Sequence, residues 1–151
     1  MWIHTLRRDQ MVPRPLHEVF EFFSDAGNLQ EITPAYLDFR ILTPRPIEIK
    51  RGTLLDYRLK WHGLPIRWQT RILEWNPPYG FVDLQLKGPY KLWRHTHSFE
   101  AVEGGTHMLD IVNYELPLGP LGAVAHAIKV RRDVEGIFDY RQEVIARKFA
   151  R

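Results

Sequence analysis

The sequence contains no cysteine, which excludes disulfide bonds, thiolate-ligated zinc sites and thiol nucleophiles together. No stretch approaches the roughly 18 consecutive apolar residues that a membrane-spanning helix needs. The first eight residues also lack the apolar segment of a signal peptide. We therefore expect a cytoplasmic protein without a membrane span.

Serine is nearly absent too, since Ser24 and Ser98 are the only two. Neither lies in a Gly-x-Ser-x-Gly motif, which disfavours a serine hydrolase. The sequence also lacks both glycine-rich motifs that cradle phosphates in nucleotide-binding proteins. We expect no cofactor.

An excess of charge of one sign is missing as well. The chain has 21 Lys and Arg against 18 Asp and Glu, a net charge of +3. Basic residues occur at most in pairs such as Arg7-Arg8 and Arg131-Arg132. A nucleic-acid-binding domain gathers its positive charge on one face, so nucleic acid is not an expected partner.

Aromatic residues are abundant by contrast, at 13% of the 151 residues, including five Trp. Large rings cover core surface efficiently, and they also line apolar ligand pockets. The length suits a single domain covering residues 1–151.

The order of expected elements is a strand, two short helices, a run of strands and a long helix. Residues 2–12 suggest a strand, and Leu16, Val19, Phe20 and Phe23 recur at helical spacing. A second short helix is expected at about 27–32. Further strands are expected at 36–43, 53–62, 66–75, 81–87, 92–102 and 106–116. Their short connections predict an antiparallel meander.

The last thirty residues predict one long amphipathic helix at 120–149. At 100° per residue, one apolar stripe collects Val124, Ala127, Val134, Phe138, Ile145 and Phe149. The dry face of the sheet is the natural partner for this stripe. Arg131 falls 20° from its centre, and Arg141 falls on its flank.

The final hairpin carries the polar residues that stand out. With Gly104-Gly105 as a two-residue loop, Phe99 faces Asp110, His97 faces Val112 and His95 faces Tyr114. The apolar face then holds Trp93, His95, His97, Phe99, Met108, Asp110, Val112, Tyr114 and Leu116. Two histidines and an aspartate thus point into an apolar interior, where polar groups need partners.

Three interpretations of that cluster are open: a satisfied structural network, a polar anchor in a ligand cavity, or a metal site. The His-x-His pattern resembles the cupin metal motif, but Glu100 comes too early and Glu103 too late for its carboxylate. We expect no metal. Trp61, Trp68 and Trp93 share the inward phase of their strands, and three such rings on one concave sheet favour a cavity.

Several stretches give the chain a resemblance to the SRPBCC superfamily, which includes START domains, polyketide cyclases and birch-pollen-allergen-like proteins. The most specific is Trp93-Arg94-His95-Thr96-His97-Ser98-Phe99, and others are Val12-Pro13-Arg14-Pro15, Gly88-Pro89-Tyr90 and Tyr114-Glu115-Leu116-Pro117. More closely, the chain resembles a bacterial branch of ligand-binding SRPBCC proteins. The resemblance implies an α+β helix-grip fold, with a curved antiparallel sheet of about seven strands and a long C-terminal helix enclosing a deep cavity.

We therefore expect binding of a small hydrophobic or aromatic molecule, lipid- or polyketide-like, in that cavity. The candidate ligand-binding residues are Tyr57, Trp61, Trp68, Trp93, His95, His97, Phe99, Asp110, Tyr114, Arg131, Phe138 and Arg141. The alternative is a cyclase or dehydratase, with His97 as general base oriented by Asp110 and Tyr114 as proton donor. A third alternative is a partner domain with a filled core. The resemblance also suggests association with a nucleotide-sugar epimerase-like protein, while the sequence leaves the oligomeric state open.

Overall fold

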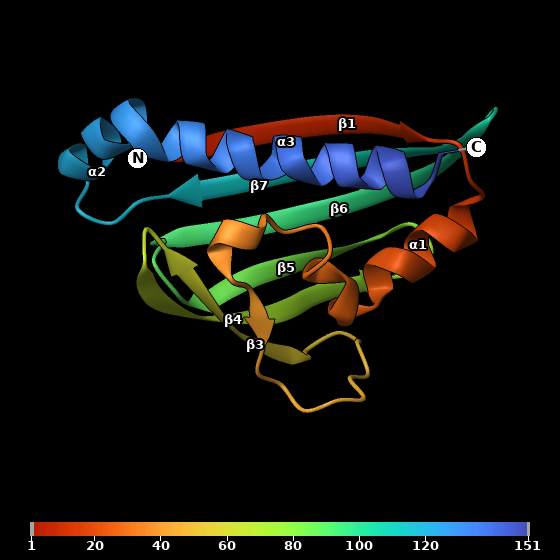
Figure 1. Ribbon diagram of the computed structural model, residues 1–151, viewed down its shortest axis with the longest axis horizontal. Coiled ribbons are helices and arrows are strands. Elements are labelled where there is room, and N and C mark those ends of the chain that lie inside the picture. Colours follow the sequence, from red (N-terminus) through yellow and green to blue (C-terminus); the bar gives the residue numbers. More distant parts are fainter. Residues whose placement is uncertain (1, 151) are drawn as a thin grey trace.

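A computed structural model describes residues 2–150 and shows one curved antiparallel sheet with a long helix lying along it (Figure 1). The seven strands follow the spatial order β1-β7-β6-β5-β4-β3-β2. The expected α+β helix-grip fold with about seven strands is confirmed.

The strands agree closely with the alternating segments of the sequence. Their bounds are β1 His4–Val12, β2 Arg40–Ile41, β3 Leu54–Trp61, β4 Leu64–Asn76, β5 Gly80–Lys87, β6 Leu92–Val102 and β7 Gly105–Glu115. The helices are α1 Leu16–Ser24, the 3-10 turns η1 Ala26–Leu29 and η2 Ala35–Leu37, α2 Pro120–Ala125, the π-helical segment η3 His126–Val130, and α3 Arg131–Lys148.

Two predicted elements between α1 and β3 are wrong. The second short helix is reduced to the turn η1, and the strand predicted at 36–43 is reduced to the two residues of β2, with η2 at its start. Asp38 has a left-handed backbone (φ 43°), which ends η2 and interrupts any extended run through this segment. The segment instead covers one side of the cavity described below.

The register of the last hairpin differs from the predicted one by two residues. Val102 pairs with Gly105, so the loop is Glu103-Gly104, and His97 lies opposite Asp110. Gly105 is the first residue of β7, and β1 passes so close to it that a side chain there would collide with the carbonyl oxygen of Val12. A shift of two residues keeps every side chain on its predicted face, because side chains alternate with period two.

The core fills one half of the space between helix and sheet. Phe20 and Phe23 of α1 pack with Phe99 of β6, and Ile145 and Phe149 close this half from the C-terminal helix. The other half, around Val134 and Phe138, is only partly filled. The ligand cavity lies there.

The C-terminal helix runs without interruption through α2, η3 and α3, but its buried face is not the predicted one throughout. Val134, Phe138 and Ile145 are buried as predicted, whereas Val124 is 56% exposed and Ala127 is exposed as well. The π-helical turn of η3 has more residues per turn than an α-helix, so a phase counted at 100° per residue fails across it. This end of the helix also extends past the end of β7 (Figure 1).

Candidate functional site

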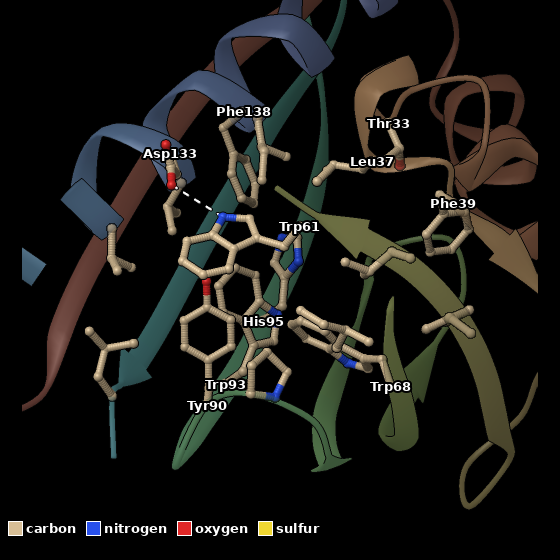
Figure 2. A pocket seen from close by; sticks show the side chains of 18 of the residues that line it. Thr33, Leu37, Phe39, Trp61, Trp68, Tyr90, Trp93, His95, Asp133 and Phe138 are labelled. Atoms are coloured by element: carbon tan, nitrogen blue, oxygen red, sulfur yellow. Dashed lines mark hydrogen bonds between the residues drawn. The ribbon is translucent and has the colours of Figure 1, made fainter. Parts of the chain in front are cut away.

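A cavity of about 460 Å³ lies between the concave face of the sheet, α3 and the segment from η1 to η2. That volume falls within the range of small-molecule sites, roughly 300–1,000 Å³. Leu37, Phe39, Trp61, Trp68 and Phe138 are among the side chains that surround it (Figure 2). The protein therefore has a preformed, mostly apolar cavity, which argues against a filled core.

The floor of the cavity is aromatic. The ring centroids of Trp68 and Trp93 lie 5.4 Å apart at 88°, and those of Tyr90 and Trp93 lie 4.8 Å apart. Edge-to-face contacts of this kind hold the rings in fixed positions. Burial raises the pKa of Tyr57 and of Tyr90, so both phenols keep their protons at neutral pH.

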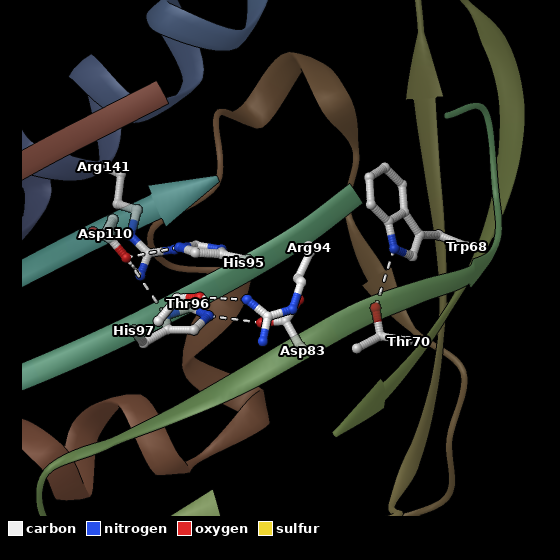
Figure 3. A network of polar contacts seen from close by, with 9 residues as sticks. All are labelled: Trp68, Thr70, Asp83, Arg94, His95, Thr96, His97, Asp110 and Arg141. Carbon is white, nitrogen blue, oxygen red and sulfur yellow. Dashed lines mark hydrogen bonds and ion pairs between the residues drawn. The ribbon is translucent and has the colours of Figure 1, made fainter. Parts of the chain in front are cut away.

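Polar residues gather at the inner end of the cavity and form a connected cluster, which we call the inner cluster: Asp83, His95, His97, Asp110 and Arg141 (Figure 3). Nε2 of His97 lies 2.6 Å from Oδ2 of Asp83 on the neighbouring strand. Nε2 of His95 lies 2.8 Å from Oδ1 of Asp110, and an Arg141 nitrogen lies 3.5 Å from the same oxygen. Three strands and α3 thus contribute to one network.

The protonation of the cluster follows from its partners. Burial alone would raise the pKa of Asp110, but the Arg141 guanidinium and the His95 hydrogen bond outweigh it and lower that pKa. Burial likewise opposes ionisation of Asp83, yet the hydrogen bond and charge of His97 hold its pKa below the usual value. Because ionised carboxylates only accept hydrogen bonds, Nε2 carries the proton in both histidines.

The two histidines differ in what they can offer a ligand. Burial and the neighbouring His95 lower the pKa of His97 to about 4, so His97 is neutral at pH 7. Its Nδ1 is enclosed by protein and lies 3.5 Å from Asp110. Nδ1 of His95, by contrast, has no hydrogen-bond partner among residues 2–150, and His95 lines the cavity. His95 is therefore the histidine that a ligand can reach.

Asp83, His95 and His97 also place one ligand atom each within 4.8 Å of one another, as a metal site would. The two imidazole rings, however, are stacked with centroids 3.6 Å apart. If a nitrogen of each imidazole bound the same metal at a distance of about 2.0–2.1 Å, the two ring centroids would lie on the order of 5 Å apart. The rings would have to separate to hold an ion, so the stacking favours hydrogen bonding over metal binding.

The mouth of the cavity is crossed by a hydrogen bond. The indole N–H of Trp61, at the tip of the β3–β4 hairpin, donates to Oδ2 of Asp133 on α3 at 3.2 Å (Figure 2). Asp133 also pairs with Lys129 one turn earlier at 3.3 Å. This contact connects the hairpin to the helix over the entrance.

Most of the residues proposed from the sequence lie on the cavity wall: Tyr57, Trp61, Trp68, Trp93, His95, His97, Phe138 and Arg141. Three others are buried elsewhere. Phe99 belongs to the core under α1, and Asp110 lies behind the histidines. The Tyr114 hydroxyl forms a 2.6 Å hydrogen bond with His126, away from the inner cluster.

The positions of Arg131 and Arg141 differ from those predicted from the apolar stripe of the C-terminal helix. Arg131, predicted near its centre, is exposed and pairs with Glu135 at 3.1 Å. A long charged side chain leaves an apolar stripe readily when solvent is near. Arg141, predicted on the flank, is buried against Asp110 and the rings of Phe23 and Phe138.

The site residues that sequence reasoning missed include Asp83, Tyr90 and Asp133. Asp83 had a usable signal, because it shares the strand phase of Phe81 and thus places a carboxylate on the inward face. Tyr90 lies in a loop and Asp133 on the polar side of the predicted helix. Neither position has a periodic pattern that would point inward.

Among residues 2–150, no helix is long and apolar enough to cross a membrane.

The chain is similar in structure to CV1439 from Chromobacterium violaceum, with a TM-score of 0.76 and 13% identity over 97% of each chain. It is also similar to the di-domain ARO/CYC StfQ from the steffimycin biosynthetic pathway, with a TM-score of 0.74 and 14% identity over 99% of this chain and 51% of that one. A third similar structure is the major latex-like protein 151 of Panax ginseng, with a TM-score of 0.71 and 11% identity over the whole of both chains.

Similarity at such low identity demonstrates a shared fold and leaves the function open. No curated protein matches the sequence. A family model described as polyketide cyclase / dehydrase and lipid transport matches residues 12–136, which is most of the chain and includes both histidines and Asp83. The chain therefore belongs to this family, within the SRPBCC superfamily that its sequence resembles.

Proposed function

We propose that the protein binds a small, largely apolar and aromatic molecule whose single polar group reaches the inner cluster. The observation that carries the proposal is the cavity of about 460 Å³, walled by tryptophan and tyrosine and closed at its inner end by His95 and Arg141. Apolar pockets with a few convergent polar groups are the usual form of small-molecule sites.

The charge of the inner cluster indicates what kind of polar group fits. Asp83 and Asp110 contribute two negative charges and Arg141 one positive charge, while the lowered pKa of His97 keeps that imidazole neutral at pH 7. A ligand carboxylate would add a further negative charge in a buried place, where unpaired charge is costly. A ketone, phenol or other uncharged group fits better, because His95 and Arg141 can bond it without adding charge.

Mass spectrometry of the purified protein tests this proposal. Native spectra should show a bound molecule, and organic extraction should release a neutral compound with an aromatic or long apolar skeleton. Release of a carboxylic acid or a phosphate ester as the main component would contradict the proposed ligand class.

Acid–base chemistry on the ligand is a second candidate, favoured by the pair of Asp110 and His95. Asp110 accepts a hydrogen bond from Nε2 of His95, which lines the cavity, so Nδ1 is the His95 nitrogen that would take a proton from a ligand. His95 thereby replaces His97 as the candidate base, because Nδ1 of His97 is enclosed. Such a base would take a proton from the carbon next to a ligand carbonyl and return it either to the enolate carbon or to the alkoxide formed when the enolate attacks a second carbonyl of the ligand.

Exchange of hydrogen for deuterium tests the second candidate without knowledge of the natural substrate. In deuterium oxide, 2-tetralone should exchange its acidic α-hydrogens faster with the protein than without it. The His95→Gln variant should lose this acceleration, and His107→Gln, at a partly exposed histidine paired with Asp9, should keep it. Equal exchange in all samples would leave ligand binding alone as the function.

Association with an epimerase-like protein and a cytoplasmic location stay predictions from the sequence.

A further inference from the structure

The most exposed large apolar side chains of the protein gather at one end. Leu118, Leu121 and Ile128 are 75%, 71% and 72% exposed, more than any other large apolar residue among residues 2–150. Val124 is 56% exposed and Trp2 45%. We call these five residues the mouth patch. Soluble monomers rarely expose apolar residues in such a group unless the surface has a partner.

The mouth patch adjoins the entrance of the cavity. Leu118 and Leu121 line the cavity while they are exposed to solvent. Leu121, Val124 and Ile128 follow one another at helical spacing on α2 and η3. Trp2 lies against the loop before α2, with its indole nitrogen 3.8 Å from the position of a Cβ at Gly119. Figure 1 shows α2 beyond the end of the sheet, next to the start of β1.

Two further exposed apolar residues extend the entrance on its other side. Tyr36 on η2 is 68% exposed, and its neighbour Leu37 lines the cavity. Leu64, 63% exposed, pairs with Trp61 at the hairpin tip. A flat apolar partner placed on α2 would therefore meet apolar groups around the opening.

The charge of the same segment has one sign. Residues 116–132 contain Lys129, Arg131 and Arg132 and no acidic residue. Lys129 and Arg131 pair with acidic residues one turn later, but these pairs are exposed and weak enough to exchange for other anions. Apolar side chains flanked by Lys and Arg, with a Trp at the edge, are typical of helices that lie in the interface of an anionic membrane.

We propose that the mouth patch docks on an anionic lipid surface and seats the cavity entrance against it, so that an apolar ligand passes between bilayer and cavity without crossing water. The passage of ligand rests on the proposed function. The docking itself does not, because it needs only the exposed residues of α2 and η3, together with Leu118 and Trp2.

Sedimentation with lipid vesicles tests the docking with the full chain. We compare vesicles of equal parts phosphatidylglycerol and phosphatidylcholine with vesicles of phosphatidylcholine alone. The wild type should bind the anionic vesicles at least tenfold more tightly, and the difference should shrink as salt is raised. The double variant Leu121→Glu with Ile128→Glu should lose most of the binding, and Arg131→Ala with Arg132→Ala should lose the preference for anionic lipid.

The matched control adds the same two charges elsewhere. Met11 and Tyr79 are 54% and 59% exposed and lie outside the mouth patch, so Met11→Glu with Tyr79→Glu should bind vesicles like the wild type. Circular dichroism should show the native spectrum for every variant. Failure of the wild type to sediment with either vesicle, or equal losses in the two Glu double variants, would overturn the proposal. So would a wild-type dimer that Leu121→Glu with Ile128→Glu converts to a monomer, because a second copy would then cover the patch.

The vesicle experiment and a ligand-binding experiment test the docking and the proposed function independently. A protein that binds a neutral aromatic probe but no vesicle retains the function without the docking. A protein that sediments with anionic vesicles but binds no probe retains the docking without the function.

Discussion

The carboxylate of Asp110 accepts a hydrogen bond from Nε2 of His95 at 2.8 Å, inside the layer between sheet and helix. Both side chains are almost fully buried. The pair fixes the orientation of the one imidazole that has a free nitrogen on the cavity wall. It also neutralises part of the charge of Arg141, which lies 3.5 Å from the same oxygen.

Removal of this carboxylate should be costly. In Asp110→Ala, His95 loses its acceptor and the buried Arg141 loses the carboxylate with which it pairs, a change that typically costs about 3–5 kcal/mol. Urea denaturation at pH 7 measures the loss in the free energy of unfolding.

The chain offers a matched control for that experiment. Asp9 and His107 form a pair of the same length, 2.8 Å, but at the surface. Asp9→Ala should cost less than about 1 kcal/mol, because exposed pairs contribute little. Equal losses in the two variants would mean that burial does not set the strength of the Asp110 pair.

Stability should fall as the pH is lowered from about 6.5 towards 4. The pKa of His97 is lowered to about 4 in the folded protein, while the unfolded chain takes up the proton near 6.5. Within this window the unfolded state binds more protons, so each step down in pH favours unfolding, by a total on the order of 3 kcal/mol for this group. Burial and the neighbouring His4 lower the pKa of His126 in the same direction.

The variant His97→Gln isolates that contribution, because the glutamine amide can still donate to Asp83. Its free energy of unfolding should depend less on pH between 6.5 and 4 than that of the wild type. The lowered pKa of Asp110 reduces stability mainly below about pH 5, so the contribution of His97 is clearest between pH 6.5 and 5. An unchanged pH dependence would show that His97 is protonated equally in both states.

The hydrogen bond between Trp61 and Asp133 should slow ligand exchange. Asp133→Ala removes the contact over the mouth, so association and dissociation of a probe should both accelerate, by about fivefold for a hydrogen bond worth about 1 kcal/mol, with little change in affinity. Stopped-flow fluorescence with N-phenyl-1-naphthylamine measures both rates. Glu135→Ala, which breaks an i,i+4 pair on the same helix but no contact to β3, should leave both rates unchanged; equal acceleration would refute the role of the mouth contact.

The buried face of the final hairpin could be predicted from the sequence although its register could not. Alternation along β6 places His95 and His97 on one side whatever the partner residue is, whereas the register depends on how closely Gly105 approaches β1. The inward phase of Trp61, Trp68 and Trp93 likewise follows from alternation alone, and all three line the cavity.

The parts that could not be predicted depend on contacts between elements distant in sequence. The partner of His97 is Asp83 on β5, and only the β5–β6 pairing brings the two together. The exposure of Val124 follows from the π-helical turn and from the end of the sheet beneath it, and that of Arg131 from the solvent and from Glu135 within its reach. A prediction that assumes 100° per residue over all thirty residues takes account of neither the π-helical turn nor the end of the sheet.

Titration with N-phenyl-1-naphthylamine tests the central claim, that an apolar molecule with an uncharged polar group occupies the cavity. The wild type should bind this neutral probe with one site per chain and should bind its sulfonated analogue, 1-anilinonaphthalene-8-sulfonate, at least tenfold more weakly. Leu59→Trp fills the cavity from β3 and should abolish binding, while Leu54→Trp, on the exposed side of the same strand, should not. Undiminished binding in Leu59→Trp, or tighter binding of the sulfonate than of the neutral probe, would contradict the account.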